Sequence, residues 1–479
     1  MNASFRRAAA LAAALTLATA AVRAEDRTLR LDLYHTGTKG EEVFAVDEVV
    51  LEPLPWPGNP DRPIDDSNRG EYLFEVIEPE GGRVLYSRGY STIFEEWQST
   101  ADAADKHRTF HESLRFPLPA GPVAVRVLRR DTNNRFAEVW RTSVDPEDML
   151  VNRAPPGPRG DLIAIQERGK PADKVDLLIL GDGYTAAELD KFEADARRGA
   201  EALFAVSPFR ERRDDFNVWA LAVPAAESGV ARPSSGLWRD SPLGTRYDIF
   251  RSERYVLTYD NRAFRDIAAH APYDAVEILV NNETYGGGGI FGLYSTASAG
   301  SAWAGYLFVH EFGHHFAGLA DEYYTSPVAY EPARYTVEPW EPNVTALADP
   351  AALKWAEFAT ASSPVPTPWP KAEYEETMRA FQAERAELRR AGRPEAEMNA
   401  LFTKVQSFVD SLFVEAPDSA AIGAFEGAYY AASGYYRPAM NCLMFTRHEA
   451  FCPVCAAAVE ETIDLYAGAG GDRHDATRH

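Results

Sequence analysis

The segment 310–324, HEFGHHFAGLADEYY, carries the clearest chemical pattern in this sequence. It opens with His310, Glu311 and His314 in the spacing His-Glu-x-x-His. On a helix, residues i and i+4 lie on one face, so the two imidazoles can bind one zinc ion. Glu311 follows the first ligand, where its carboxylate can reach a water bound to the metal. The pattern predicts a catalytic zinc site with Glu311 as general base.

Two carboxylates follow the histidines closely enough to complete such a site. A catalytic zinc ion takes three protein ligands and keeps one position open for water. Gly318 suits the end of a helix at which the chain turns sharply, and Asp321 and Glu322 come directly after that turn. Either side chain could instead serve a structural role, in a cap or a surface ion pair. His315 points off the ligand face, and we do not expect it to bind the metal.

Predicted strands and helices alternate between about residues 161 and 325, the region that must position these residues. Strand-like segments lie at 175–184, 216–224 and 275–282, and helix-like segments at 185–206 and 263–272. Thr185 and Glu188 form a capping box at the start of one helix. A glycine run at 286–289 precedes residues 290–296, which we expect to form a short edge strand beside the cleft. This alternation predicts a three-layer α/β unit in which one helix carries the site.

The remaining segments predict a multidomain chain. Short strands separated by Gly-, Pro- and Asn-rich turns recur through residues 25–150 and predict a β-sandwich. Residues 151–160 form a Pro/Gly-rich linker, and 161–466 form the catalytic domain. Within it, the charge-rich segment 365–415 predicts an inserted helical hairpin, either a solvated excursion or a lid. Residues 467–479 read as a flexible tail.

The N-terminal 24 residues have the pattern of a signal peptide. Arg6 and Arg7 precede an apolar run at 8–22, and Val22-Arg23-Ala24 suits cleavage. A single membrane anchor is the alternative, but the run is short and rich in alanine, and no other segment approaches the length of a span. We therefore expect an exported protein, periplasmic or extracellular. The net charge of −23 disfavours nucleic acid and anionic membranes as partners.

Three cysteines lie close together near the C-terminus: Cys442, Cys452 and Cys455. In an exported protein they suggest one local disulfide and one odd thiol, with the pairing open. The Cys452-Pro-Val-Cys455 motif could instead be half of a structural zinc site, although the sequence has no second Cys-x-x-Cys.

Several motifs in the same order resemble the IgA peptidase family of metallopeptidases, over roughly residues 25–466. They are VDLLILGDGYT, HEFGHHFAGLADEYY, GAFEGAYYAASGYYRP, and MNCLMF followed by FCPVC. The resemblance implies a metzincin-like domain behind an N-terminal β domain. In metzincins the third ligand follows a Gly turn by three residues, which favours Asp321 over Glu322, although the step from His314 to Gly318 is one residue longer here. The resemblance also implies that Met444 forms a Met-turn beneath the zinc.

The sequence as a whole thus predicts an α+β or α/β protein that hydrolyses peptide bonds in protein or peptide substrates. One zinc ion would activate water, and Tyr323, Tyr435, Tyr436 or Arg437 would stabilise the oxyanion or bind substrate. Two alternatives stay open: an exported, non-catalytic zinc- or protein-binding module, and a zinc amidase or carboxypeptidase acting on small or cell-wall substrates. The oligomeric state does not follow from the sequence.

Overall fold

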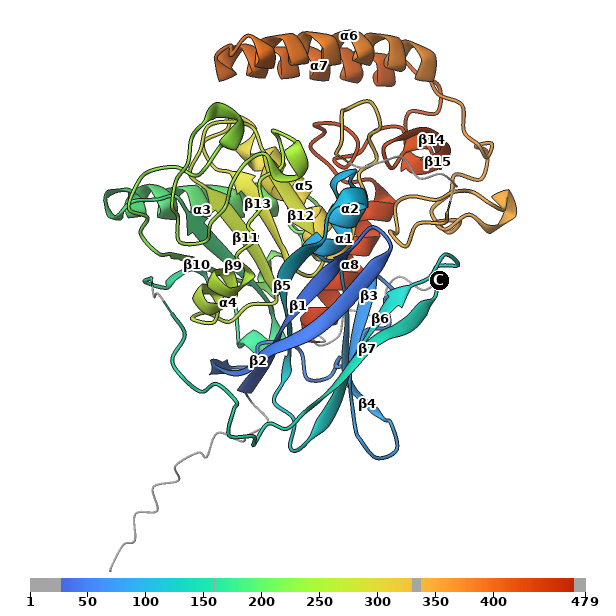
Figure 1. Cartoon of the computed structure of the whole chain (residues 1–479). Helices are drawn as coiled ribbons and strands as arrows, with labels where there is room; N and C mark the ends of the chain where they lie inside the picture. Colours follow the sequence, from blue (N-terminus) through green and yellow to red (C-terminus); the bar gives the residue numbers. More distant parts are fainter. Residues whose placement is uncertain (1–26, 158–159, 330–336, 469–479) are drawn as a thin grey trace, which may run out of the picture.

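The computed structural model describes residues 27–157, 160–329 and 337–468 of the chain (Figure 1). The predicted signal peptide, and all of the C-terminal tail except residues 467 and 468, lie outside the described residues. The architecture is mixed α and β, with several separate sheets. None of the described helices combines the length and apolar character that crossing a bilayer requires.

Residues 27–144 form two antiparallel sheets. One has the order β2-β1-β5, from β1 (Arg27–Thr38), β2 (Glu41–Pro55) and β5 (Arg108–Pro117). The other has the order β4-β3-β6-β7, from β3 (Tyr72–Ile77), β4 (Val84–Tyr90), β6 (Val123–Arg130) and β7 (Phe136–Val144). Alternate residues of both sheets, such as Leu31, Phe74 and Val125, pack into one core. This agrees with the strands expected from the period-2 pattern.

Two short helices connect β4 to β5. Helix α1 (Ile93–Gln98) begins after Thr92, whose hydroxyl accepts a hydrogen bond from the Glu95 amide at 3.0 Å. Helix α2 (Asp102–Asp105) follows it directly. Phe94 and Trp97 of α1 are buried, which turns the acidic Glu95 and Glu96 to the other side of the helix. Helix α1 lies beside the candidate active site, and Glu95 and Glu96 line its cleft.

The second part of the chain is built on a six-stranded sheet of order β12-β13-β11-β9-β10-β8. Strands β9 (Val175–Asp182), β10 (Phe216–Ala222), β11 (Ala275–Val280) and β13 (Tyr294–Ser298) are parallel, whereas the edge strands β8 (Ile163–Gln166) and β12 (Gly287–Ile290) are antiparallel. Every residue of β9 and β11 is buried, as expected for strands covered on both faces.

Helices cover the two faces of this sheet. Odd-numbered residues of β9 pack with α3 (Leu189–Ala205) and α5 (Ala304–Ala317), and even-numbered residues pack with α4 (Asn261–Ala268). The predicted capping box precedes α3: the Glu188 carboxylate accepts from the Thr185 amide at 2.9 Å. The expected layered α/β unit, with α5 carrying the histidines, matches this arrangement.

The edge strand differs from the expectation. It is formed by the glycines themselves, in β12, whereas residues 291–293 turn and Tyr294–Ser298 form the interior strand β13. The reason is steric: a Cβ atom on Gly289 would lie 2.3 Å from the backbone oxygen of Glu311, and one on Gly287 would lie 3.0 Å from Glu311 Cγ. Glycine therefore lets α5 lie directly against the edge of the sheet.

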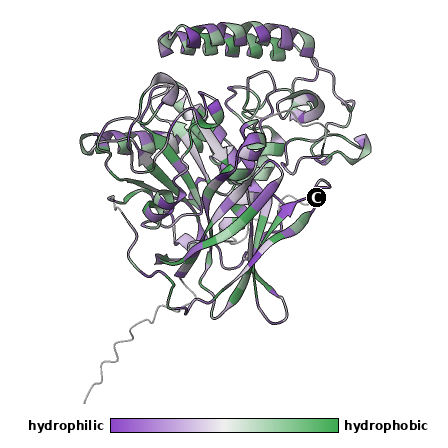
Figure 2. Ribbon diagram, in the orientation of Figure 1, coloured by the Kyte–Doolittle hydropathy of each residue, from purple (hydrophilic) through white to green (hydrophobic). Residues whose placement is uncertain are grey.

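The C-terminal third carries three further units. The expected helical hairpin consists of α6 (Lys371–Arg390) and α7 (Glu395–Val414), separated by Gly392 in the left-handed conformation. Figure 2 shows hydrophilic and hydrophobic residues alternating along it, and one face buries residues such as Met398 and Phe402. A two-stranded sheet of β14 (Ile422–Ala428) and β15 (Ala431–Ala439) was not anticipated, and α8 (Pro453–Tyr466) ends the described chain.

The two parts of the chain contact each other through polar and charged pairs. Asn261 of α4 donates to Ser113 Oγ of β5 at 2.8 Å, and Arg30 of β1 pairs with Asp266 at 2.8 Å. The Ser91 amide donates to the Phe291 carbonyl at 2.9 Å, just beyond β12. These contacts hold α1 near strand β12 and the end of α5.

Candidate metal centre

The helix that carries the histidines ends where the sequence predicted. Gly318 caps α5 in the left-handed conformation, at φ 63°, and its amide donates to the His314 carbonyl at 3.1 Å. A Cβ atom at this position would lie 2.8 Å from the Trp340 ring, so glycine is needed for space as well as for the turn. The reversal brings Asp321 back over the helix.

Three side-chain atoms converge at this point. His310 Nε2 lies 3.2 Å from His314 Nε2 and 3.1 Å from Asp321 Oδ1, and the third side of the triangle is 3.3 Å. Tetrahedral zinc with bonds of about 2.0–2.1 Å places its ligand atoms about 3.3–3.4 Å apart. The three residues therefore have the spacing and donor types that a shared zinc ion requires.

Backbone carbonyls orient both imidazoles. His310 Nδ1 lies 3.1 Å from the Leu443 carbonyl, and His314 Nδ1 lies 2.5 Å from the Leu319 carbonyl. When each Nδ1–H donates to its carbonyl, the lone pair of each neutral Nε2 is directed at the centre of the triangle. Asp321 supplies the negative charge: burial alone would raise the pKa of its carboxyl, but the imidazoles of His314 and His310, when protonated, hold it well below its usual range.

Glu311 lies beside this triangle in the same cleft. Burial raises the pKa of its carboxyl above the ordinary value, and the nearby imidazoles of His310 and His314 oppose that rise. A carboxylate with a raised pKa is better suited to take and return a proton near neutral pH. Its position and its chemistry fit a general base.

The two carboxylates after the Gly turn point in different directions. Asp321 faces the histidines, whereas Glu322 turns away and accepts from Asn343 Nδ2 at 2.9 Å. The described structure thus brings Asp321, rather than Glu322, to the metal ligands. His315 also lies off this face: its Nδ1–H donates to the Ile290 carbonyl at 3.1 Å, and its Nε2 accepts from the Val276 amide at 3.0 Å.

Met444 is fully buried beneath the helix. A Cβ atom on Gly313 would lie 3.2 Å from its sulfur, so the absence of a side chain at Gly313 lets Met444 approach α5 between the two histidines. Arg437 is buried outside the cleft, where it donates to the Gly427 carbonyl at 2.8 Å and stacks on Phe445. Tyr435 lines the cleft, but Tyr436, its neighbour on β15, does not.

Three residues near the site were missed by sequence reasoning, and one of them is Tyr306, whose hydroxyl lies 3.1 Å from His310 Nδ1. The Tyr430 hydroxyl donates to Asp321 Oδ2 at 2.6 Å. Arg254 donates to the hydroxyl of Tyr323, and both residues line the cleft. Tyr430 lies within the aromatic segment already singled out, but its spacing gave no sign of this contact. Arg254 belongs to no motif at all, because it reaches the site only through folding.

The cleft around these residues has a volume of about 560 Å³. Both parts of the chain form its walls. Glu95 and Glu96 of α1 lie on one side, the glycines of β12 follow the edge of the sheet, and Trp340 and Tyr429 belong to the C-terminal third. Burial and the neighbouring Glu96 raise the pKa of Glu95 well above its usual value. The cleft therefore has an acidic wall, in which a bound cation would stabilise the charged form of Glu95.

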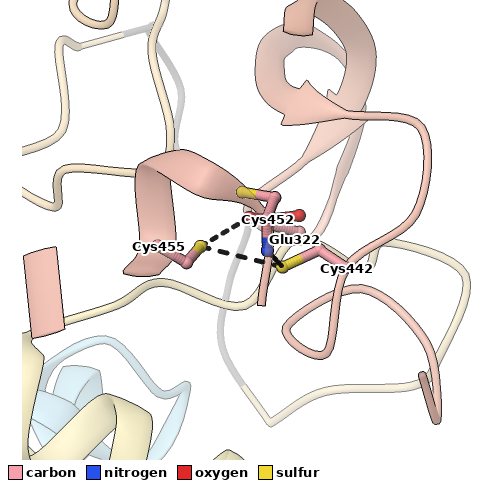
Figure 3. Close-up of side chains that lie close together, drawn as sticks. All are labelled: Glu322, Cys442, Cys452 and Cys455. Atoms are coloured by element: carbon pink, nitrogen blue, oxygen red, sulfur yellow. Dashed lines mark hydrogen bonds between the residues drawn. The ribbon is translucent and has the colours of Figure 1, made fainter. Parts of the chain in front are cut away.

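The three cysteines occupy a separate, buried position. All are free thiols in the structure, and Glu322 lies among them (Figure 3). Cys442 Sγ and Cys455 Sγ are 3.7 Å apart, and Cys455 Sγ lies 3.3 Å from Glu322 Oε1. The residue that turns away from the histidines thus joins the cysteines.

Comparison with known proteins gives two matches along the chain. Residues 163–463 match the family described as IgA Peptidase M64, and residues 22–141 match the family described as Peptidase M64 N-terminus. The first match contains the six-stranded sheet, the histidine helix and the cysteines, and the second contains the two antiparallel sheets. No curated protein matches the chain.

Proposed function

The chain belongs to the IgA peptidase M64 family, and we propose that it is a zinc-dependent endopeptidase acting on protein substrates. One observation carries the proposal: Nε2 of His310, Nε2 of His314 and Oδ1 of Asp321 lie 3.1–3.3 Å from one another. Glu311 stands beside them in an open cleft, where a substrate can reach it.

His310, His314 and Asp321 would hold the zinc ion, which when bound polarises a carbonyl and makes water more acidic. Glu311 takes the proton of the attacking water on its carboxylate and delivers it to the nitrogen of the leaving amine. Tyr430 holds Asp321 by a hydrogen bond to Oδ2, the oxygen that does not face the histidines. The Leu443 and Leu319 carbonyls orient the imidazoles. Arg254 and Tyr323 supply donors for the developing oxyanion.

The arrangement supports a metzincin-like catalytic domain. The third ligand follows a helix-ending glycine, as in that group, and Met444 lies under the histidine helix. The antiparallel edge strand β12 borders the cleft. On the side away from β13, the amide and carbonyl of Gly287 already bond to Arg254 and Val256, so an extended peptide could add only beyond Gly287.

Substrate chemistry follows from the acidic wall. Glu95, Glu96 and Glu71 come from the N-terminal sheets and α1, and they line the cleft that holds the histidines. We propose that the N-terminal part of the chain binds segments of substrate rich in Lys or Arg beside the scissile bond.

A carboxypeptidase is the second candidate, and one observation favours it. Arg254 is a half-buried cation within the cleft, and a guanidinium can bind a terminal carboxylate in two parallel hydrogen bonds. End-group analysis of digested proteins separates the two reactions: internal cleavage yields new N-termini within the chain, whereas terminal cleavage releases single amino acids.

Export is also a proposal, supported by the leader pattern at residues 1–24. It is tested by N-terminal sequencing of the protein produced in a bacterial host, where cleavage after Ala24 is expected. A mature chain that keeps Met1 would contradict it.

The decisive experiment is digestion of a protein mixture by the wild-type chain and by the Glu311→Gln variant, with zinc measured in both. The variant should retain zinc and lose at least about a hundredfold in turnover, because the base is gone and the ligands remain. Chelation should abolish wild-type activity, and added zinc should restore it. Wild-type turnover in a zinc-loaded Glu311→Gln variant would refute the assignment of the base.

A further inference from the structure

Four metal-binding side chains converge a short distance from the histidines, on the other side of the Asp321–Glu322 step. They are Glu322, Cys442, Cys452 and Cys455, and all four are buried (Figure 3). One donor atom from each can be chosen such that all four lie within 4.8 Å of one another. They come from three segments: the loop after α5, the loop after β15, and the N-terminus of α8.

We propose that these four residues bind a second zinc ion, which has a structural rather than a catalytic role. Thiolates are preferred ligands of zinc, and four protein ligands close the coordination sphere, as structural sites require. The proposal does not depend on the peptidase activity, because it concerns other side chains and leaves no open position for water.

The distances fit a zinc site better than a disulfide. Tetrahedral zinc with Zn–S bonds of about 2.3 Å places two sulfurs about 3.8 Å apart, and a sulfur and a carboxylate oxygen about 3.5 Å apart. The observed separations are 3.7 Å for Cys442 and Cys455, and 3.3 Å for Cys455 and Glu322. Cys452 Sγ completes the group, since the four donor atoms all lie within 4.8 Å of one another.

Among the described residues, no cationic side chain forms an ion pair with the carboxyl group of Glu322, and the buried Arg437 acts on it only from beyond contact distance. Glu322 is fully buried, and among the described residues its Oε2 has no hydrogen-bond partner. Its other oxygen accepts only from Asn343 and the Cys455 thiol. A carboxylate in such a place costs several kcal/mol unless a cation compensates it, on the order of the penalty for any buried unpaired charge. A divalent ion at the centre of the cluster would supply that charge.

The surrounding backbone suits thiolates. The Cys452 amide donates to Cys442 Sγ at 3.3 Å, which resembles the amide-to-sulfur bonds that stabilise bound thiolates. Cys452 is the N-cap of α8, a helix of 14 residues, so Cys452 and Cys455 lie at its positive end. Binding of zinc there would displace the thiol protons.

The position of the cluster gives the second ion a function. The Glu322 amide donates to the Met444 carbonyl at 3.0 Å, and the carbonyl of Leu443 orients His310. Glu322 directly follows Asp321, and Cys442 precedes Leu443. An ion bound to Glu322 and Cys442 would therefore join the loop that carries the third catalytic ligand to the loop that supports the first one. The histidine site would be held in place by a second metal site behind it.

The test uses a His310→Ala/His314→Ala variant of the whole chain, purified without oxygen and without chelators. It has lost two of the three catalytic ligands and keeps all three cysteines. We expect about one zinc per chain in this variant and about two in the wild type. Loaded with cobalt instead, the variant should show the near-ultraviolet absorption of thiolate-to-cobalt charge transfer, which histidine and carboxylate ligands do not produce. A metal-free variant, or cobalt binding without that absorption, overturns the proposal.

Two further measurements test the ligands, and the second of them needs no cysteine variant. Adding Cys452→Ser and Cys455→Ser to the double-alanine variant should remove the remaining ion, whereas the exposed control Glu449→Gln should not. Thiols are also counted in denaturant, with chelator and without reductant. Three reactive thiols per chain support the metal site. One reactive thiol per chain would mean that two cysteines form a disulfide, and the proposal would be wrong.

Discussion

The Tyr430 hydroxyl donates a 2.6 Å hydrogen bond to Oδ2 of Asp321, while Oδ1 of the same carboxylate faces His310 Nε2 at 3.1 Å. One oxygen of Asp321 is thus fixed by a phenol, and the other is aimed at the proposed metal position. The two residues lie on different loops, and nothing in their spacing along the chain connects them. Tyr430 would therefore act on a bound metal through Asp321, as a positioning residue.

Replacement of Tyr430 by Phe should weaken zinc binding by about 10- to 100-fold, the usual effect of losing a group that orients a metal ligand. The measurement is zinc competition against a chromogenic chelator. Tyr429→Phe is the matched control, because that hydroxyl contacts Glu341 at 3.1 Å instead. Equal zinc affinity in the Tyr430→Phe variant and the wild type would show that Asp321 needs no such support.

Arg254 should matter for turnover more than for substrate binding. If its guanidinium stabilises the oxyanion, Arg254→Met should lower kcat by about 100- to 1000-fold, with a smaller change in KM. Arg251→Met is the control, since that side chain is exposed and pairs with Asp102. A rise in KM with unchanged kcat would instead assign Arg254 to ground-state binding, as the carboxypeptidase alternative requires.

The acidic wall should set a preference for basic peptides. The double variant Glu95→Gln/Glu96→Gln replaces two carboxyl groups of the cleft with amides of nearly the same size. We expect kcat/KM to fall about tenfold or more for peptides with Lys or Arg, and to change little for neutral peptides. Glu147→Gln, an exposed site outside the cleft, serves as control. An equal loss for both peptide classes would contradict an electrostatic origin.

His315 makes the stability of the fold depend on pH. Burial lowers the pKa of His315 to about 4, below the value of about 6.5 in an unfolded chain. The unfolded state therefore binds a proton first as the pH falls. The stabilisation is complete above about pH 6.5 and is lost as the pH falls toward 4, by about 3 kcal/mol in total.

This dependence is measured as the free energy of unfolding in denaturant between pH 7 and pH 4. His315→Gln cannot take up the proton, so its curve should be shallower than that of the wild type over this range, although the variant is less stable overall. Parallel curves for the two proteins would show that other groups cause the acid sensitivity, such as the metal ligands.

Local patterns were enough to predict most of the secondary structure and the central motif. The period-2 segments of residues 27–144 became the expected strands, because alternation directly reports which face is buried. The spacing of four residues predicts that His310 and His314 share one face of a helix. The turn at Gly318 left both Asp321 and Glu322 as candidates, and the resemblance to metzincins favoured Asp321. All of these relationships involve residues close together in the chain.

Where local signals compete, sequence reasoning was less successful. A glycine run normally indicates a loop, yet Gly287–Ile290 form the edge strand, because α5 lies too close to that edge for any side chain. Arg437 has the chemistry of an oxyanion donor, but its position in β15 turns it into the core against Phe445.

The residue spacing predicts the kind of chemistry: two imidazoles and a carboxylic base on one helix, with a third ligand just beyond it. The groups that surround this centre became visible in the folded chain alone. Tyr430 and Arg254 reach it from distant segments, and Glu322 leaves it to meet three cysteines more than a hundred residues further along the chain. Such contacts depend on how loops close over a packed core, and no residue spacing records that.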